Sequence, residues 1–294
     1  MTNKLWFGIP GVHMQYVPCP SVSSPIQRNR YVERMQFENG GGDARRSVQY
    51  QMEYQFSFSG PAHEVEGIDA FNKFASGFYG DGLIHLAHPA NFETNLFPAA
   101  WATPALIEQG WANIATATPT FANTNVSNYG QPPRTASWTI TEQRNTYTQS
   151  VTLVIPPTHT LHLGVSGVAT GDGVVRVAPI NVDGSNGDDV DLTLLSKSSS
   201  TRMNTTFDGS EFQAVRLYIT RKTGTATTST VSITSMMAQL YKTGTTPALP
   251  TSHYTGEGST GLMFVDDAIV ETYSYMYPPR KGIATTLVEV EAWR

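Results

Sequence analysis

Two pairs of histidines have a spacing that could support metal chemistry. His85 and His88 are three residues apart, with Glu93 soon after them, and His159 and His162 repeat the spacing. A helical zinc motif has a glutamate directly after its first histidine, and neither pair has that glutamate or lies in a predicted helix. We therefore expect these histidines to be half-buried at strand ends, in loops or at interfaces, without a bound metal.

A run of acidic and amide side chains between residues 183 and 191 could present oxygen atoms to calcium. Calcium takes about six to eight oxygen ligands and tolerates the geometry of a loop. The run lacks the order Asp-x-Asp-x-Asp-Gly with a later Glu, so a solvated turn explains it equally well. We expect no cofactor, and we keep calcium open with Asp183, Asp188 and Asp189 as candidate ligands.

Aromatic and planar polar side chains in the middle of the chain fit the needs of sugar binding. A flat ring can stack on the apolar face of a sugar, while guanidinium and carboxylate groups bind its hydroxyls. The candidates of these two kinds are Trp138, Tyr147, Arg134, Arg144 and Glu142. The alternative for Trp138 is that its ring lies in the core between two sheets.

No motif of the sequence predicts catalysis. The chain has no Gly-x-Ser-x-Gly turn, phosphate-binding loop or dinucleotide fingerprint. The adjacent carboxylates Asp266 and Asp267 would point to opposite faces of a strand and could not act on one substrate. We expect a protein that is not an enzyme.

Size and composition limit the functions that remain. With 294 residues the chain allows one large domain or two ordinary ones at about 150 residues each. Its net charge of -5 disfavours binding to phosphate backbones. A single cysteine, Cys19, excludes an internal disulfide. The sequence also lacks the apolar core of a signal peptide and a run of about 18 apolar residues, so it predicts a soluble chain without a membrane span.

The first hundred residues predict strands and one helix. Large apolar residues alternate with polar ones from Gln49 to Ser59, which predicts a half-buried strand. Residues 30–38 alternate more loosely, and a glycine run separates them from that strand, so we expect the two to form a hairpin. Apolar residues at steps of three and four predict a helix from about Glu64 to Tyr79, ended by Gly80.

The middle of the chain differs from both ends in amino-acid composition and in the pattern of its strand-like runs. Residues 111–246 are rich in Thr, Ser, Gly and Asn and contain short strand-like runs separated by turns, which predicts an antiparallel β-sandwich. The last 40 residues return to the pattern of the first hundred. We therefore expect a domain formed by residues 1–110 and 250–294, with a sandwich of residues 111–249 inserted between its halves.

Several stretches resemble the minor tail proteins of siphophages that infect actinobacteria, in particular the distal-tail (Dit-like) group. The stretches that carry the resemblance are Leu5-Trp-Phe-Gly-Ile-Pro, residues 71–86, Asn95-Leu-Phe-Pro-Ala-Ala-Trp, residues 236–247, residues 256–264 and Leu287-Val-Glu-Val-Glu-Ala-Trp. They cover about half of the chain and include no catalytic signature.

The resemblance implies a structural protein of the phage tail tip, located in the virion after assembly in the host cytoplasm. It implies a mainly β fold: a Dit-like β-sandwich or barrel hub with one helix, plus the inserted sandwich of carbohydrate-binding or jelly-roll-like type. The hub would form a ring with copies of itself, expected to be a hexamer. Its other partners would be the tail tube, tape measure and tip hub proteins, and host-surface polysaccharide through the insert.

Aromatic residues of the hub halves are the candidates for hub core or subunit contacts, namely Tyr50, Tyr54, Phe56, Phe71, Phe78, Tyr275 and Trp293. A modest negative charge, repeated around a ring, would let DNA pass through the lumen without binding. Two alternatives remain open for the function: a cell-wall or capsule glycan hydrolase with its own sandwich domain, and a free carbohydrate-binding module.

Overall fold

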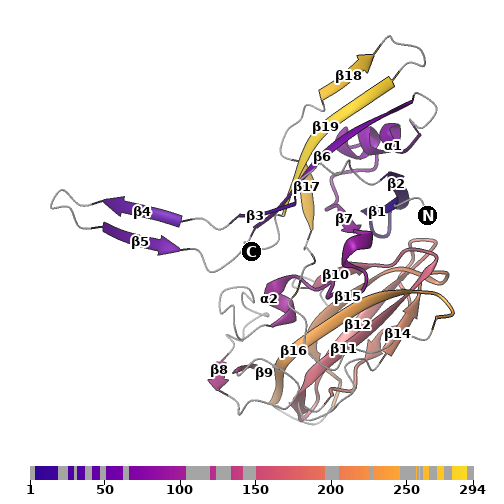
Figure 1. Ribbon diagram of the computed structural model, residues 1–294. Helices are drawn as coiled ribbons and strands as arrows, with labels where there is room; N and C mark the ends of the chain where they lie inside the picture. Colours follow the sequence, from indigo (N-terminus) through magenta and orange to yellow (C-terminus); the bar gives the residue numbers. More distant parts are fainter. Residues whose placement is uncertain are drawn as a thin grey trace.

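The protein is mainly β, with four antiparallel sheets, a separate two-stranded hairpin and one helix of more than a single turn among the described residues. The structure is a computed structural model (Figure 1), and it describes residues 4–18, 26–29, 32–36, 42–46, 51–61, 66–103, 120–123, 134–141, 150–195, 205–224, 228–245, 256, 258, 261–264, 270–274 and 280–289.

One sheet joins the two ends of the chain. Its strand order is β17–β19–β6–β3, and β18 also pairs with β19. The bounds are β3 (Ile26–Asn29), β6 (Gln51–Pro61), β17 (Leu262–Phe264), β18 (Val270–Ser274) and β19 (Arg280–Glu289). The strand β6, whose alternation was clear in the sequence, is confirmed, and its even-numbered aromatics Tyr54 and Phe56 are buried.

A smaller sheet and a helix cover this sheet. The small sheet has the order β2–β1–β7, with β1 (Lys4–Ile9), β2 (His13–Pro18) and β7 (His85–Ala87). The helix α1 (Glu66–Ala75) buries Phe71 and Phe74. We call the strands β1–β3, β6, β7 and β17–β19 together with α1 the head–tail module.

The sandwich contains the other two sheets, which share one hydrophobic core. Their orders are β14–β11–β16–β9–β8 and β10–β15–β12–β13. The bounds are β8 (Thr120–Asn123), β9 (Arg134–Ile140), β10 (Val151–Val154), β11 (His159–Thr170), β12 (Gly173–Asn181), β13 (Val190–Asp191), β14 (Thr205–Asp208), β15 (Phe212–Arg221) and β16 (Ser229–Lys242). β14 and β16 belong to the first of these sheets and β15 belongs to the second, so these consecutive strands alternate between the sheets. As a result, β15 does not pair with β14 or β16 but with β10 and β12.

Two short helices follow β7 and lead toward the sandwich. They are the 3₁₀ turn η2 (Pro89–Asn91) and the single turn α2 (Ala99–Ala102). The predicted domain boundaries at 110/111 and 249/250 lie outside the described residues and stay predictions.

The expected hairpin between residues 30–38 and the strand at Gln49–Ser59 is wrong. Instead β4 (Val32–Gln36) pairs with β5 (Gly42–Arg46), and β6 pairs with β3 and β19. Residue Gly42, counted with the glycine-rich connection in the sequence, is the first residue of β5 and pairs with Gln36. This hairpin, which we call the arm, extends away from the head–tail module (Figure 1).

The helix α1 is confirmed, but it ends earlier than expected. The N–H of Phe78 donates to the carbonyl of Lys73 (2.9 Å), and that of Gly77 donates to the carbonyl of Phe74 (3.1 Å). With Gly77 at a φ of 70° this is a Schellman C-cap, which a glycine accommodates without strain. Because the chain leaves the helix at Gly77 and not at Gly80, Phe78 does not continue the buried stripe.

Candidate functional site

The strand β1 lies between the hydrophobic cores of the two parts of the molecule and contributes side chains to both. Its odd-numbered residues Leu5, Phe7 and Ile9 belong to the core of the head–tail module, whereas Trp6 belongs to the core that includes the sandwich. Successive side chains of a strand point to opposite faces, so a strand between two cores is apolar on both faces. The opening sequence Leu-Trp-Phe-Gly-Ile has this composition because both faces are buried.

The segment after β7 is bound to the edge of β16. The N–H of Leu96 donates to the carbonyl of Ala238 (2.9 Å), and the N–H of Leu240 donates to the carbonyl of Phe92 (2.8 Å). The fully buried amide of Asn95 donates to the carbonyl of Met236 (2.9 Å) and accepts from the N–H of Ala238 (3.1 Å). This side chain therefore completes backbone hydrogen bonds in the sandwich from outside it.

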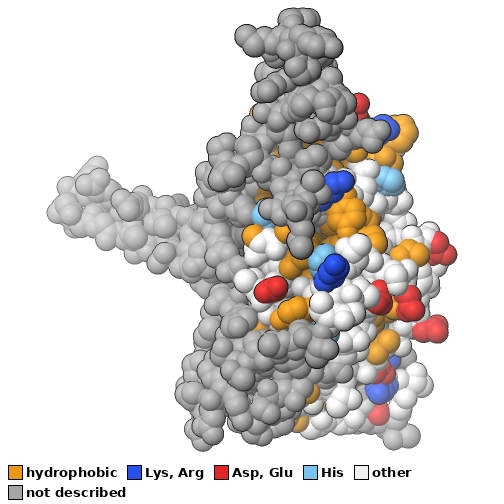
Figure 2. Space-filling model, turned by 45° about the vertical axis from the view of Figure 1, so that its right-hand side comes forward, with side chains coloured by type: hydrophobic (Ala, Val, Ile, Leu, Met, Phe, Trp, Pro, Cys, Tyr) orange, Lys and Arg blue, Asp and Glu red, His pale blue; other side chains and the backbone are white. Residues whose placement is uncertain are grey.

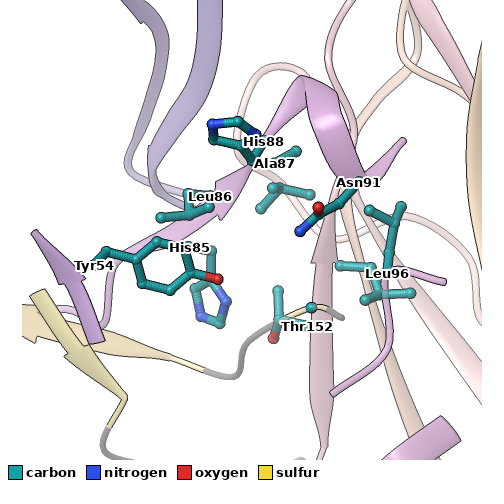
Figure 3. A pocket seen from close by; sticks show the side chains of 11 residues that line it. Tyr54, His85, Leu86, Ala87, His88, Asn91, Leu96 and Thr152 are labelled. Atoms are coloured by element: carbon teal, nitrogen blue, oxygen red, sulfur yellow. The ribbon is translucent and has the colours of Figure 1, made fainter. Parts of the chain in front are cut away.

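A small cavity lies at the same junction (Figure 3). Its volume is about 20 Å³, which is room for one water molecule. The side chains of Tyr54, His85 and Thr152 point toward this space from β6, β7 and β10 (Figure 3). Residues of the head–tail module and of the sandwich thus meet around it.

The cavity holds a neutral histidine. Burial and, to a smaller extent, the positive charge of Arg216 together lower the pKa of His85 to about 4. An imidazole with this pKa is neutral near pH 7, with one ring N–H and no positive charge, and it is a weak base. The geometry therefore supports a role of His85 in packing and hydrogen bonding at the junction.

The histidine pairs do not form metal sites. His85 points into the cavity while His88 points away from it (Figure 3), and His88 Nδ1 accepts from the N–H of Ala90 (3.2 Å). Burial lowers the pKa of both His159 and His162, and Lys242 lowers that of His159 further. Across the described ranges, no group of three His, Cys, Asp or Glu residues is placed to hold a metal ion.

The acidic candidates for calcium have other partners. Asp183 Oδ1 accepts from the hydroxyl of Ser185 (2.6 Å) and from its N–H (2.9 Å), and these bonds lower the pKa of the carboxyl. Asp189 Oδ2 accepts from the hydroxyl of Tyr218 (3.1 Å). Asp188 is exposed in the same turn. Asp183 is thus bound within its own turn, and Asp189 is bound to a side chain of β15.

The glycan candidates differ in burial and in whether they lie among the described residues. Trp138 is fully buried in the sandwich core, so its ring offers no face to a sugar, and we withdraw it as a glycan contact. The reason is its position on β9, where it lies between the two sheets. Arg134 begins β9, and Glu142, Arg144 and Tyr147 lie outside the described residues.

The hub candidates separate into two groups. Tyr54, Phe56 and Phe71 are buried in the head–tail core. Phe78 is 70% exposed, with its ring 5.1 Å from that of Tyr79. Tyr50, Tyr275 and Trp293 lie outside the described residues.

Sequence reasoning missed the strand β11, the arm and Asn95. The apolar residues Leu161, Leu163 and Val165 recur at every second position and could have predicted β11, but the pair Pro156-Pro157 just before them indicated a loop. No sequence signal separates Asn95 from other asparagines, because its partners are 141 and 143 residues away.

Within the described part of the chain, none of the helices has the length and apolar character needed to cross a bilayer.

Comparisons with known proteins give no family for the chain. No protein-family model and no curated protein matches it. A solved structure of an infectious bursal disease virus VP2 subviral particle is 12% identical over 98% of this chain and 76% of that chain, with a TM-score of 0.26. The structure of the Gx strain of the same virus is 12% identical over 97% and 73%, with a TM-score of 0.22. Scores this low assign neither a fold nor a function.

Proposed function

We propose that this protein is a structural component of a phage tail tip, a minor tail protein of the distal-tail type, which forms a ring hub between the tail tube and the tip. The hub is the head–tail module, in which β6 pairs with β19 from Glu53 opposite Val288 to Pro61 opposite Arg280. This role requires positioning and contact between subunits and no catalysis.

The arm is the observation that carries the proposal. A lone two-stranded hairpin is at best marginally stable in water, so an arm that extends from the body favours a partner that covers it. The arm comes from the same module as both chain ends (Figure 1). A second copy of the chain in a ring would supply such a partner.

The sandwich is proposed as the outward domain that aids adhesion to host-surface glycans. In Figure 1 it lies to one side of the head–tail module, so a ring could be built from the modules with the sandwiches at its periphery. Alternation of consecutive strands between two sheets is compatible with the jelly-roll-like fold that the resemblance implies. The negative net charge of -5 is compatible with DNA passing through a ring lumen without being held.

The experiment is a measurement of mass and shape on the purified full chain. Light scattering after size exclusion and negative-stain electron microscopy should show a ring, expected to be a hexamer. A monomer at every concentration tested would contradict the hub role. A monomer that releases reducing sugar from cell-wall polysaccharide would favour the hydrolase. Sedimentation with insoluble host cell wall tests adhesion separately, with and without calcium.

A further inference from the structure

The imidazole of His85 is a buried polar group whose own hydrogen bonds the protein does not complete. The residue is only 7% exposed, and among the described residues no group forms a hydrogen bond with either ring nitrogen. A neutral imidazole has one nitrogen that donates and one that accepts. Buried groups of this kind nearly always bond to protein or to ordered water, because an unpartnered one lowers stability. We therefore expect a partner for this ring in the space beside it.

The cavity at the junction has the size and the lining that one water molecule needs. Its volume is about 20 Å³, whereas a water requires roughly 10–15 Å³ and two to four polar neighbours. The ring of His85 and the side chain of Thr152 both point into it, as does Tyr54 (Figure 3). The hydroxyl of Thr152, like the imidazole, makes no hydrogen bond within the described part of the chain. Two buried polar groups thus face one small space.

Other occupants fit this cavity less well. A metal ion needs several ligands, but His88 points away from the space, and no three His, Cys, Asp or Glu residues converge anywhere in the described ranges. The positive charge of Arg216 acts on His85 and disfavours any cation. A carboxylate or phosphate group is larger than a single water. A neutral ligand of one heavy atom matches both the volume and the lining.

We propose that the cavity binds one ordered water molecule, which joins His85 of the head–tail module to Thr152 of the sandwich through hydrogen bonds. Water can donate to the accepting nitrogen of the ring and to the threonine oxygen, and can accept from either group. The phenol of Tyr54 is a third polar neighbour. A bridge of this kind is nearly as favourable in enthalpy as a direct hydrogen bond.

The bridge would fix how the two parts of the molecule sit against each other. The apolar contacts of the same junction, such as Trp6 and Ala87 in the core that includes the sandwich, favour burial without favouring one direction. Hydrogen bonds prefer particular distances and angles, so a water held from both sides restricts sliding of β7 over β10. This inference goes beyond the proposed function, because it applies equally to a single chain and to a ring.

The direct test is a crystal structure of the full chain at about 1.8 Å resolution or better. The expected result is a water peak within about 2.7–3.2 Å of one ring nitrogen of His85 and of Thr152 Oγ1. A ring nitrogen bonded directly to a protein group, with no peak in the cavity, would overturn the proposal. So would a peak with the anomalous scattering of a heavier ion such as chloride. Either result leaves the hub role untouched.

A double-mutant cycle tests the same bridge in solution. Thr152→Val and His85→Phe each remove one polar end while keeping a similar shape, and urea unfolding gives the unfolding constant of each variant and of the double variant. Each single change leaves the other group buried without a full set of partners, whereas the double change makes the cavity apolar. The double variant should therefore be more stable than the product of the two single effects predicts, by at least ~5-fold in the unfolding constant. Effects that multiply to within ~2-fold would contradict a shared water.

The matched control is the same substitution at a threonine in solvent. Thr139 lies on β9 of the sandwich with an exposed side chain, so its hydroxyl already has bulk water as a partner. Thr139→Val should change the unfolding constant by less than ~3-fold and should show no coupling to His85→Phe. Coupling as strong as that of Thr152→Val would mean that the cycle reports a general effect of valine, and the bridge would lose its support in solution.

Discussion

The two cores of this protein are built from different side chains. The sandwich core is mostly aliphatic, with Leu161, Val177 and Leu217 among the buried residues that face each other across two sheets. The head–tail core is a cluster of rings, in which Phe71 lies 4.8 Å from Phe7 and 5.5 Å from Phe56. Branched aliphatic side chains fill the even gap between two sheets, whereas rings fill the less regular space under one helix.

The origin of the core residues differs as well. The sandwich draws its core from residues 136–240, apart from the contributions of β1, β7 and the segment after β7. The head–tail core takes Leu5 from the start of the chain, Phe71 from α1 and Leu287 from near the end. One core thus depends mainly on strands close in sequence, and the other depends on bringing both chain ends together.

Phe71→Ala should have the largest effect, a loss of about 3–5 kcal/mol of unfolding free energy. The ring contacts residues of β1, β6 and β17, so its removal should loosen both chain ends at once. Urea unfolding measures the loss, and hydrogen exchange should report faster exchange in β1 and β19.

Trp138→Ala is the counterpart in the sandwich and should cost a similar amount. Its exchange pattern should differ, with β9 and β16 affected more than β6 and β19. The same exchange pattern for both variants would mean that the two cores unfold as one unit, and the contrast between them would have no energetic meaning.

Asn95→Ala should destabilise the protein by about 3 kcal/mol, because buried backbone groups at Met236 and Ala238 lose their partner. Limited proteolysis should find the segment after β7 cut more readily, since it is no longer bound to β16. Glu93→Ala, two residues away with an exposed side chain, is the control and should be near neutral.

Acidification should weaken the junction between the two parts. The pKa of His85 is about 4 in the folded protein, below the ordinary value of 6.5, so the unfolded chain takes up the proton first. Stability is therefore highest above pH 6.5 and falls as the pH drops toward 4, by about 2 kcal/mol at pH 5 from this residue.

Urea unfolding at pH 7 and pH 5 measures this effect against the variant His85→Gln. The variant should lose less stability between the two pH values than the native protein, by about the amount that His85 contributes. An equal loss in both proteins would assign the pH dependence to other groups.

Lys222→Ala should have the smallest effect, about 0.5 kcal/mol or less. Lys222 Nζ lies 3.1 Å from Asp191 Oδ2, but its side chain is half exposed and water screens the pair. Thermal unfolding of the native protein and of the variant, in low and in high salt, measures this loss of stability. A loss as large as that of Asn95→Ala would show that this outer network, with Arg176 at its centre, supports the sandwich as strongly as the junction does.

Local patterns predicted much of the secondary structure. The alternation around Tyr54 and Phe56 predicted β6, and the spacing of apolar residues predicted α1, because side-chain period depends on the chain's own backbone geometry. The polar, turn-rich middle predicted short strands separated by turns for the same reason, and the structure has strands such as β9, β12 and β16 there. The candidate histidines were expected to be half-buried, which holds for His88, His159 and His162. His85 is instead buried, because it lies where the two parts of the molecule meet.

Which strands and side chains pair with each other could be learned only from the tertiary structure. The hydrogen bonding of β6 to β19, of β4 to β5 and of Asn95 to β16 depends on residues that are close only in space, and several pairings satisfy the same alternation. Burial of Trp138 and exposure of Phe78 likewise follow from where a strand lies or a helix ends, not from residue type. The sequence by itself determined that the chain forms amphipathic strands around one helix. Only the tertiary structure decided which faces meet and that the arm pairs with no other strand among the described ones, because strand pairing joins residues that are close only in space.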